Sequence, residues 1–178
     1  MAALPDLITV AQFRQMPEGG ECSYELHHGE VVAVTRPKAR HSELQHRIMM
    51  LLGTKVENFG VARIEYPYRL IPEFDLRAAD VAVISRERWA AVDPNDNLHG
   101  APELVVEVKS PSNTPGRLRE LVALCLANGS VECWIVDQEK KSVSVFQRDG
   151  AAVAYGIGDA LPLSAFGADE LPVAEIFE

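Results

Sequence analysis

Along this chain, segments with the two-residue period of a β-strand alternate with segments with the 3.6-residue period of an α-helix. In order, the pattern is a hairpin, a helix, three strands, a second helix and two strands. This alternation predicts a mixed α/β (α+β) fold, in which helices flank a central mixed sheet and a hairpin lies near the N-terminus. The strands on either side of the second helix are expected to be parallel neighbours.

The strongest helix signal covers residues 41–59, where apolar side chains recur at helical spacing. A second helix is expected from Thr114, which can cap its first turn, to Gly129, which ends it. A short helix near the N-terminus is indicated by Thr9 and Gln12, because these two residues fit a capping box.

Short runs rich in β-branched residues predict the strands. They cover residues 22–26, 31–35, 61–71, 81–84, 104–109, 133–136 and 143–146. A last strand is expected near Ala152, followed by an irregular packed C-terminal arm. Residues 1–178 are expected to form a single domain with its core at about residues 20–150.

The composition, 47% hydrophobic and 24% charged, is typical of a compact globular protein. No run approaches the roughly 18 apolar residues that a spanning helix needs, and the first ten residues have no basic region, so we expect a cytoplasmic protein without a membrane partner. The net charge of -9 argues against a general electrostatic affinity for nucleic acid. A divalent cation bound by acidic side chains would lower the local repulsion of phosphate.

Two charged residues, Glu107 and Lys109, interrupt the apolar strand run at 104–109, and their spacing places both side chains on one face. Asp80 stands at the start of a second apolar run that we expect beside the first. A buried carboxylate costs several kcal/mol unless a cation compensates it. Two carboxylates from neighbouring strands suit magnesium, which prefers oxygen ligands. Such an ion activates water and polarises a phosphate, while Lys109 stabilises the developing negative charge.

Asp80 followed by Glu107-x-Lys109 resembles the paired half-sites of the PD-(D/E)XK nuclease superfamily. Further motifs, spread over roughly residues 20–150, resemble the bacterial Uma-type restriction endonuclease family. These motifs are Tyr24-Glu25-Leu26, Gly29-Glu30-Val31, Leu104-Val105-Val106-Glu107-Val108, Ser110-Pro111-Ser112 and Cys133-Trp134-Ile135-Val136-Asp137.

The resemblance implies a restriction-endonuclease-like core, a magnesium (Mg²⁺) or manganese (Mn²⁺) cofactor, DNA as the partner and hydrolysis of its phosphodiester bonds. Many enzymes of this fold are dimers, so a homodimer is expected. The resemblance also implies roles for four residues: Asp80 and Glu107 as metal ligands, Lys109 as the catalytic lysine and Glu25 as an additional acid of the site. The family often has a histidine near the pocket, where this chain has His41.

The chain departs from the family pattern at two places. Ala78-Ala79-Asp80 replaces Arg-Pro-Asp, and Leu121 stands where the helix often has a lysine. Glu25 is either a solvent-facing acid of the hairpin or part of the pocket, and Glu43 is a weaker candidate for the same role.

From the residues alone, two alternative functions therefore remain. One is a catalytically weak or inactive nuclease-fold module that acts in binding or assembly, which the acidic charge suits. The other is a metal-dependent phosphodiesterase that acts on another substrate.

Overall fold

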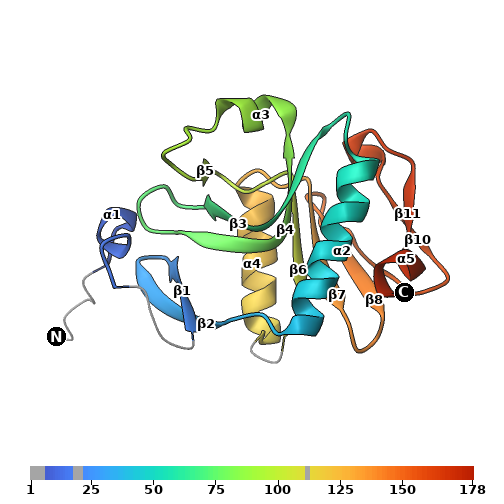
Figure 1. The fold of residues 1–178 in the computed structure, drawn as a ribbon, viewed down its shortest axis with the longest axis horizontal. Helices are drawn as coiled ribbons and strands as arrows, with labels where there is room; N and C mark the ends of the chain where they lie inside the picture. The colour runs from blue at the N-terminus through green and yellow to red at the C-terminus, as the bar shows by residue number, and fades with distance from the viewer. Residues whose placement is uncertain (1–6, 18–21, 111–112) are drawn as a thin grey trace.

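The computed structural model describes residues 7–17, 22–110 and 113–178, so part of the Ser110-Pro111-Ser112 motif lies outside the described residues. Its centre is a seven-stranded mixed sheet with the order β5-β3-β4-β6-β7-β8-β9 (Figure 1). The strands are β3 Gly60–Arg69, β4 Arg77–Ser85, β5 Leu98–His99, β6 Leu104–Val108, β7 Glu132–Asp137, β8 Ser142–Gln147 and β9 Ala152–Tyr155. The predicted mixed α+β class is confirmed.

Two helices cover opposite faces of this sheet (Figure 1). Along β4 and β6, successive apolar residues point to opposite faces of the sheet and pack into two separate cores, as the two-residue period of a strand requires. One core contains Ile48 and Leu52 of helix α2 (Ala39–Lys55), and the other contains Val122 and Cys125 of helix α4 (Pro115–Ala127). The sheet is thus buried between α2 and α4.

Local signals placed several elements correctly. Thr9 and Gln12 form the predicted capping box of helix α1 (Val10–Phe13). The hairpin consists of β1 (Cys22–His27) and β2 (Glu30–Thr35), and Gly29 between them has a φ of +81°. Thr114 caps α4, which connects the parallel strands β6 and β7.

Helix α2 begins before residue 41 and ends before residue 59, contrary to the predicted bounds. The N–H group of Val56 still bonds to Leu52, but Val56 itself has left the helical conformation. Val56 and Phe59 remain in or against the core because the chain folds back onto the sheet there, and this explains why the apolar pattern runs past the helix end. Among the described residues, no helix is long and apolar enough to cross a membrane.

The C-terminal arm is not irregular, which corrects the sequence prediction. It contains strands β10 (Ala160–Pro162) and β11 (Glu170–Pro172), a 3-10 helix η1 (Ser164–Phe166) and helix α5 (Val173–Phe177). Its apolar side chains join the core on the α2 face of the sheet. Elements of three to five residues are too short to show a period, and the same holds for helix α3 (Arg86–Ala91) and β5, which the sequence did not predict.

Candidate functional site

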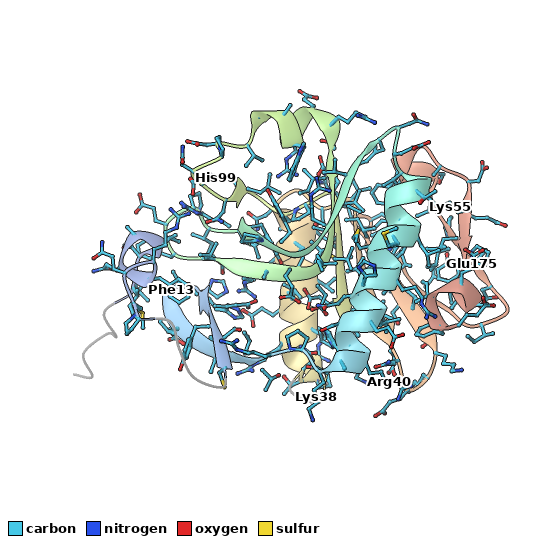
Figure 2. The ribbon with its side chains drawn as sticks, in the orientation of Figure 1. Phe13, Lys38, Arg40, Lys55, His99 and Glu175 are labelled. Atoms are coloured by element: carbon cyan, nitrogen blue, oxygen red, sulfur yellow. The ribbon has the colours of Figure 1, made fainter. Side chains whose placement is uncertain are left out.

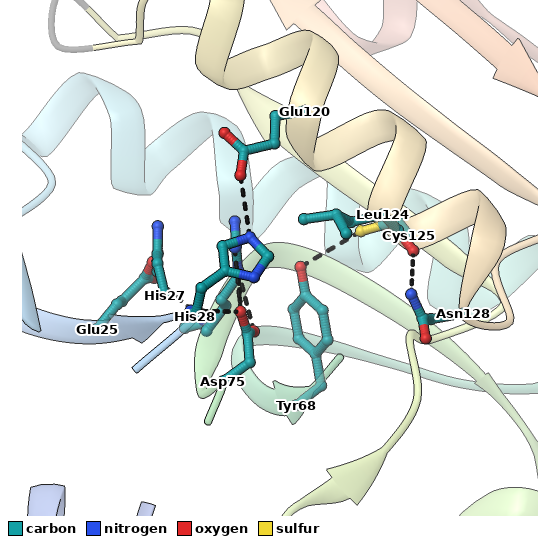
Figure 3. Close-up of polar contacts among 11 residues, drawn as sticks. Glu25, His27, His28, Tyr68, Asp75, Glu120, Leu124, Cys125 and Asn128 are labelled. Carbon is teal, nitrogen blue, oxygen red and sulfur yellow. Dashed lines mark hydrogen bonds and ion pairs between the residues drawn. The ribbon is translucent and has the colours of Figure 1, made fainter. Parts of the chain in front are cut away.

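A cavity of about 710 Å³ lies between the β1–β2 hairpin, the start of α2 and helix α4. Its size falls in the range of small-molecule sites. All four residues singled out from the sequence line it: Glu25, Asp80, Glu107 and Lys109. One wall is held by a contact between His28 of the hairpin and Glu120 of α4, whose Nε2 and Oε1 atoms lie 3.0 Å apart (Figure 3).

Asp80 lies inside β4, not at the start of the strand, and the strand is distorted there. Ala79 packs in the α4-side core and Val81 in the α2-side core, although residues two apart on a regular strand share a face. The Asp80 carboxylate faces α2. Its Oδ1 atom accepts hydrogen bonds from Nε2 of Gln45 at 2.6 Å and from Nε2 of His41 at 3.2 Å.

Asp80 and Glu107 lie at the same level of two neighbouring antiparallel strands. Val81 of β4 pairs with Val106 of β6, so Asp80 and Glu107 are each one residue beyond this pair. The N–H group of Val108 donates to Asp80 Oδ2 at 2.6 Å. The register of the two strands therefore explains why residues 27 positions apart line one cavity.

The charge of Glu107 is not balanced by an ion pair within the described part of the chain. Burial, followed by the negative charges of Asp80 and Glu25, raises the pKa of Glu107 well above its usual range. Lys109 does not compensate it, because its Nζ atom lies 3.1 Å from Oδ2 of Asp137. A divalent cation between these carboxylates would remove this repulsion.

Glu25 is part of the cavity wall and not a solvent-facing acid of the hairpin. Its Oε1 atom accepts the N–H of Ala78 at 3.1 Å, and its Oε2 atom lies 2.6 Å from Nε2 of His27. Its side chain is only 18% exposed. Glu43, the alternative from the sequence, lies instead beside Arg47 in a separate hollow of about 150 Å³.

Two further residues of the site were missed by the sequence analysis. The Gln45 amide, on a side chain that is almost completely buried, donates to Asp80 and also to Oε1 of Glu65 at 2.5 Å. Glu65 lies on β3 with a φ of +47°, a left-handed conformation that costs a residue other than glycine about 1–3 kcal/mol. Such strain is concentrated at functional sites. Neither residue has a sequence signal, because Gln45 is one polar residue of a long helix and Glu65 follows the alternation of its strand.

These contacts change the protonation of two groups. The hydrogen bond to Asp80 raises the pKa of His41 against the opposing effect of burial, and the charge of Glu65 adds to it. Burial raises the pKa of Glu65, and the nearby charge of Asp80 acts in the same direction. The cavity floor thus combines acids that repel one another with a histidine that favours its charged form.

The donors fit a magnesium ion held partly by water. Among the described residues, no group of three or more His, Cys, Asp or Glu side chains is close enough to hold a metal ion by itself. Asp80 and Glu107 supply two carboxylates, which is the number that magnesium typically takes from a protein while it keeps water and phosphate as its other ligands.

Comparisons with known proteins identify the family and the fold of the chain. A family model described as "Uma2: Putative restriction endonuclease" matches residues 10–174. A solved structure from Anabaena variabilis ATCC 29413, described as a "putative nuclease belonging to DUF820", superposes with a TM-score of 0.80 at 19% sequence identity, over 96% of this chain and 97% of that chain. At this identity the likeness shows the shared fold. No curated protein matches the chain.

Proposed function

Because the chain belongs to the Uma2 family, we propose that it is a magnesium-dependent endonuclease that hydrolyses DNA phosphodiester bonds in this cavity. The observation that carries the proposal is the placement of Asp80 and Glu107 at one level of adjacent strands, with a Glu107 charge that no described cation balances. A homodimer is proposed as well, on the expectation for the fold alone, and sedimentation of the pure protein tests it.

Asp80 and Glu107 would hold the ion, which when bound supplies an activated water and an electrophile for the phosphate oxygen. Gln45, His41 and the N–H of Val108 keep the Asp80 carboxylate in one orientation before any ligand arrives.

Lys109 is exposed enough to exchange Asp137 for a phosphate, because a surface ion pair contributes only about 0–1 kcal/mol. Its ammonium would then stabilise the charge that develops on the phosphate. Glu25 would complete the acidic wall beside the attacking water.

The test is cleavage of plasmid DNA and of a single-stranded oligonucleotide with magnesium, with manganese and with a chelator. Wild-type protein should cleave only with a metal, and Glu107→Gln and Lys109→Met should each lower the rate by about 10²-fold or more. Glu43→Gln is the matched control, since Glu43 lies outside the cavity, and it should cleave normally. Cleavage in the chelator, or full activity of both site variants, would show the proposal to be wrong.

Loss of activity through misfolding can be separated from loss of chemistry. Glu107→Gln removes a charge that Asp80 and Glu25 repel, so in metal-free buffer the variant should melt at or above the wild-type temperature. A variant that melts well below wild type would make its inactivity uninformative, and Lys109→Met would then decide the question, because the exposed Lys109 makes a single surface ion pair.

A catalytically weak binding module is the second candidate, and one observation favours it. Leu121 lines the cavity at the position where the family often has a helix lysine, while Lys109 is engaged with Asp137. Calorimetric titration with magnesium separates the two functions, because the module needs no ion at Asp80 and Glu107. Activity on small phosphodiesters without activity on DNA would instead indicate a different phosphodiesterase.

A further inference from the structure

Positive charge gathers at the cavity of an otherwise acidic chain. Six of the 17 lysines and arginines line the cavity, against only five of the 26 aspartates and glutamates. The six are Arg36, Lys38, Arg40, Arg77, Lys109 and Arg117. The whole excess of negative charge therefore lies elsewhere on the molecule, and the net charge of -9 does not describe the surface that a ligand of this cavity meets.

Four of these cations are available to a ligand. Arg36, Lys38, Arg40 and Arg117 are exposed, and within the described ranges none of their side chains has a hydrogen-bonded or ion-paired protein partner. Arg36 and Lys38 belong to the connection from β2 to α2, and Arg40 lies in the first turn of α2; Figure 2 shows Lys38 and Arg40 at the start of that helix. Arg117 comes from the first turns of α4 on another wall of the same cavity. We call these four residues the basic rim.

Three of the five lining acids, Glu25, Asp80 and Glu107, are less exposed than the basic rim. The side chains of Asp80 and Glu25 are only 16% and 18% exposed. Glu25 belongs to the hairpin, which is joined to β4 and its approach by paired backbone hydrogen bonds between Leu26 and Leu76 and contacts α4 through His28 and Glu120. A phosphate group must pass the rim and enter the cavity to reach the carboxylates.

We infer that the basic rim binds the backbone of one nucleic acid strand, and that the substrate is single-stranded DNA or a single-stranded segment; this inference rests on the proposed nuclease function. Duplex DNA is stiff over about 50 nm, so its phosphates do not bend inward to carboxylates that are this little exposed. Extruding a nucleotide from a duplex costs a few kcal/mol, whereas a single strand avoids this cost. A flexible strand passes between the β2–α2 connection and α4 with its phosphates toward the rim.

Base identity contributes little to this binding. Among the described lining residues, Tyr68 is the only phenylalanine, tyrosine or tryptophan, and its side chain is completely buried. The cavity therefore lacks the stacking surfaces on which single-strand binding proteins hold bases. Affinity comes from phosphate contacts, so it is tolerant of sequence and depends strongly on salt.

The test is binding without chemistry, measured by fluorescence anisotropy in a chelator, with a labelled thymidine oligomer of about 20 nucleotides and with its duplex. The single strand should bind about tenfold or more tightly than the duplex, as the cost of extrusion requires. If all four cations of the basic rim contact phosphates, the logarithm of the affinity should fall with the logarithm of salt concentration with a slope of about -2.8.

Arg117→Gln should reduce that slope by about 0.7. Arg119→Gln is the matched control, because Arg119 lies on the same helix but does not line the cavity, and it should leave the slope unchanged. Equal or tighter binding of the duplex overturns the inference, and so does an equal loss in both arginine variants.

The outcomes separate this inference from the proposed function. A protein that cleaves duplex DNA with magnesium and shows no preference for a single strand keeps the nuclease function and loses the inference. Preferential binding of the single strand through Arg117, with no cleavage under any metal, keeps the basic rim and overturns the nuclease function.

Discussion

Replacement of Gln45 by methionine tests how the site is held together. The amide of Gln45 donates to Asp80 Oδ1 at 2.6 Å and to Glu65 Oε1 at 2.5 Å. Methionine has a similar volume and shape, so Gln45→Met removes both donors without leaving a large cavity. Asp80 keeps the hydrogen bonds from His41 and Val108.

The expected loss in the free energy of unfolding follows from the solvent exposure of the two acceptors, Asp80 and Glu65. A hydrogen bond to a charged group contributes about 1.5–3 kcal/mol. Glu65 is exposed, and water replaces its lost donor, whereas the Asp80 side chain is only 16% exposed and is not fully rehydrated. The free energy of unfolding should therefore fall by about 1.5–3 kcal/mol, which corresponds to a drop in melting temperature of about 4–10 °C for a chain of this length.

The same substitution should weaken metal binding. In this variant the Asp80 carboxylate has lost one of its orienting donors and faces Glu65 without the shared amide. It is therefore free to rotate away from the position of the ion. Loss of a hydrogen bond to a metal ligand typically lowers metal affinity about 10–100-fold. Urea denaturation and calorimetric titration with magnesium measure the two effects separately.

Leu44→Met is the matched control for this experiment. Leu44 is the preceding residue of the same helix, is buried in the core and does not line the cavity, so this variant should lose less than about 1.5 kcal/mol and bind magnesium normally. Unchanged stability and unchanged magnesium affinity of Gln45→Met would refute the role assigned to the amide.

Two further predictions concern the scaffold. Burial opposes ionisation of Asp96, but donors that include the backbone of Asn97 lower its pKa to about 2. The ionised carboxylate therefore stabilises the folded protein above pH 3.8, and this contribution is lost as the pH falls through about 2. With allowance for screening by solvent, Asp96→Asn should lower the unfolding free energy by about 1 kcal/mol at pH 7, and urea denaturation should show this difference shrink between pH 4 and pH 2. A Cβ atom at Gly60 would lie 1.9 Å from a carbonyl oxygen of β4, so Gly60→Ala should destabilise the protein by about 1–3 kcal/mol or more in thermal melts. Gly53→Ala, in α2 with its nearest contact at 3.8 Å, should instead stabilise the protein by about 0.5–1 kcal/mol.

The elements that the sequence predicted well are those whose signal is local. The capping box at Thr9 and the cap at Thr114 each act within one turn of the chain, so the residues that form the structure are close together in the sequence. The fold class followed from the alternation of periods and the family from the resemblance of several short motifs, and both are confirmed. The roles of the four site residues stay predictions.

Other features depended on the tertiary structure because they join segments that no local pattern connects. The strand register decided that Asp80 and Glu107 lie level, the distortion of β4 turned Asp80 toward Gln45, and Glu65 entered the site from a third strand. The same is true of the segregation of charge, since a net charge of -9 is a sum over residues and carries no position. Only the tertiary fold places the basic rim and the acids around one cavity. The electrostatic energy of a phosphate there depends on its distances to these charges and not on the net charge of the chain.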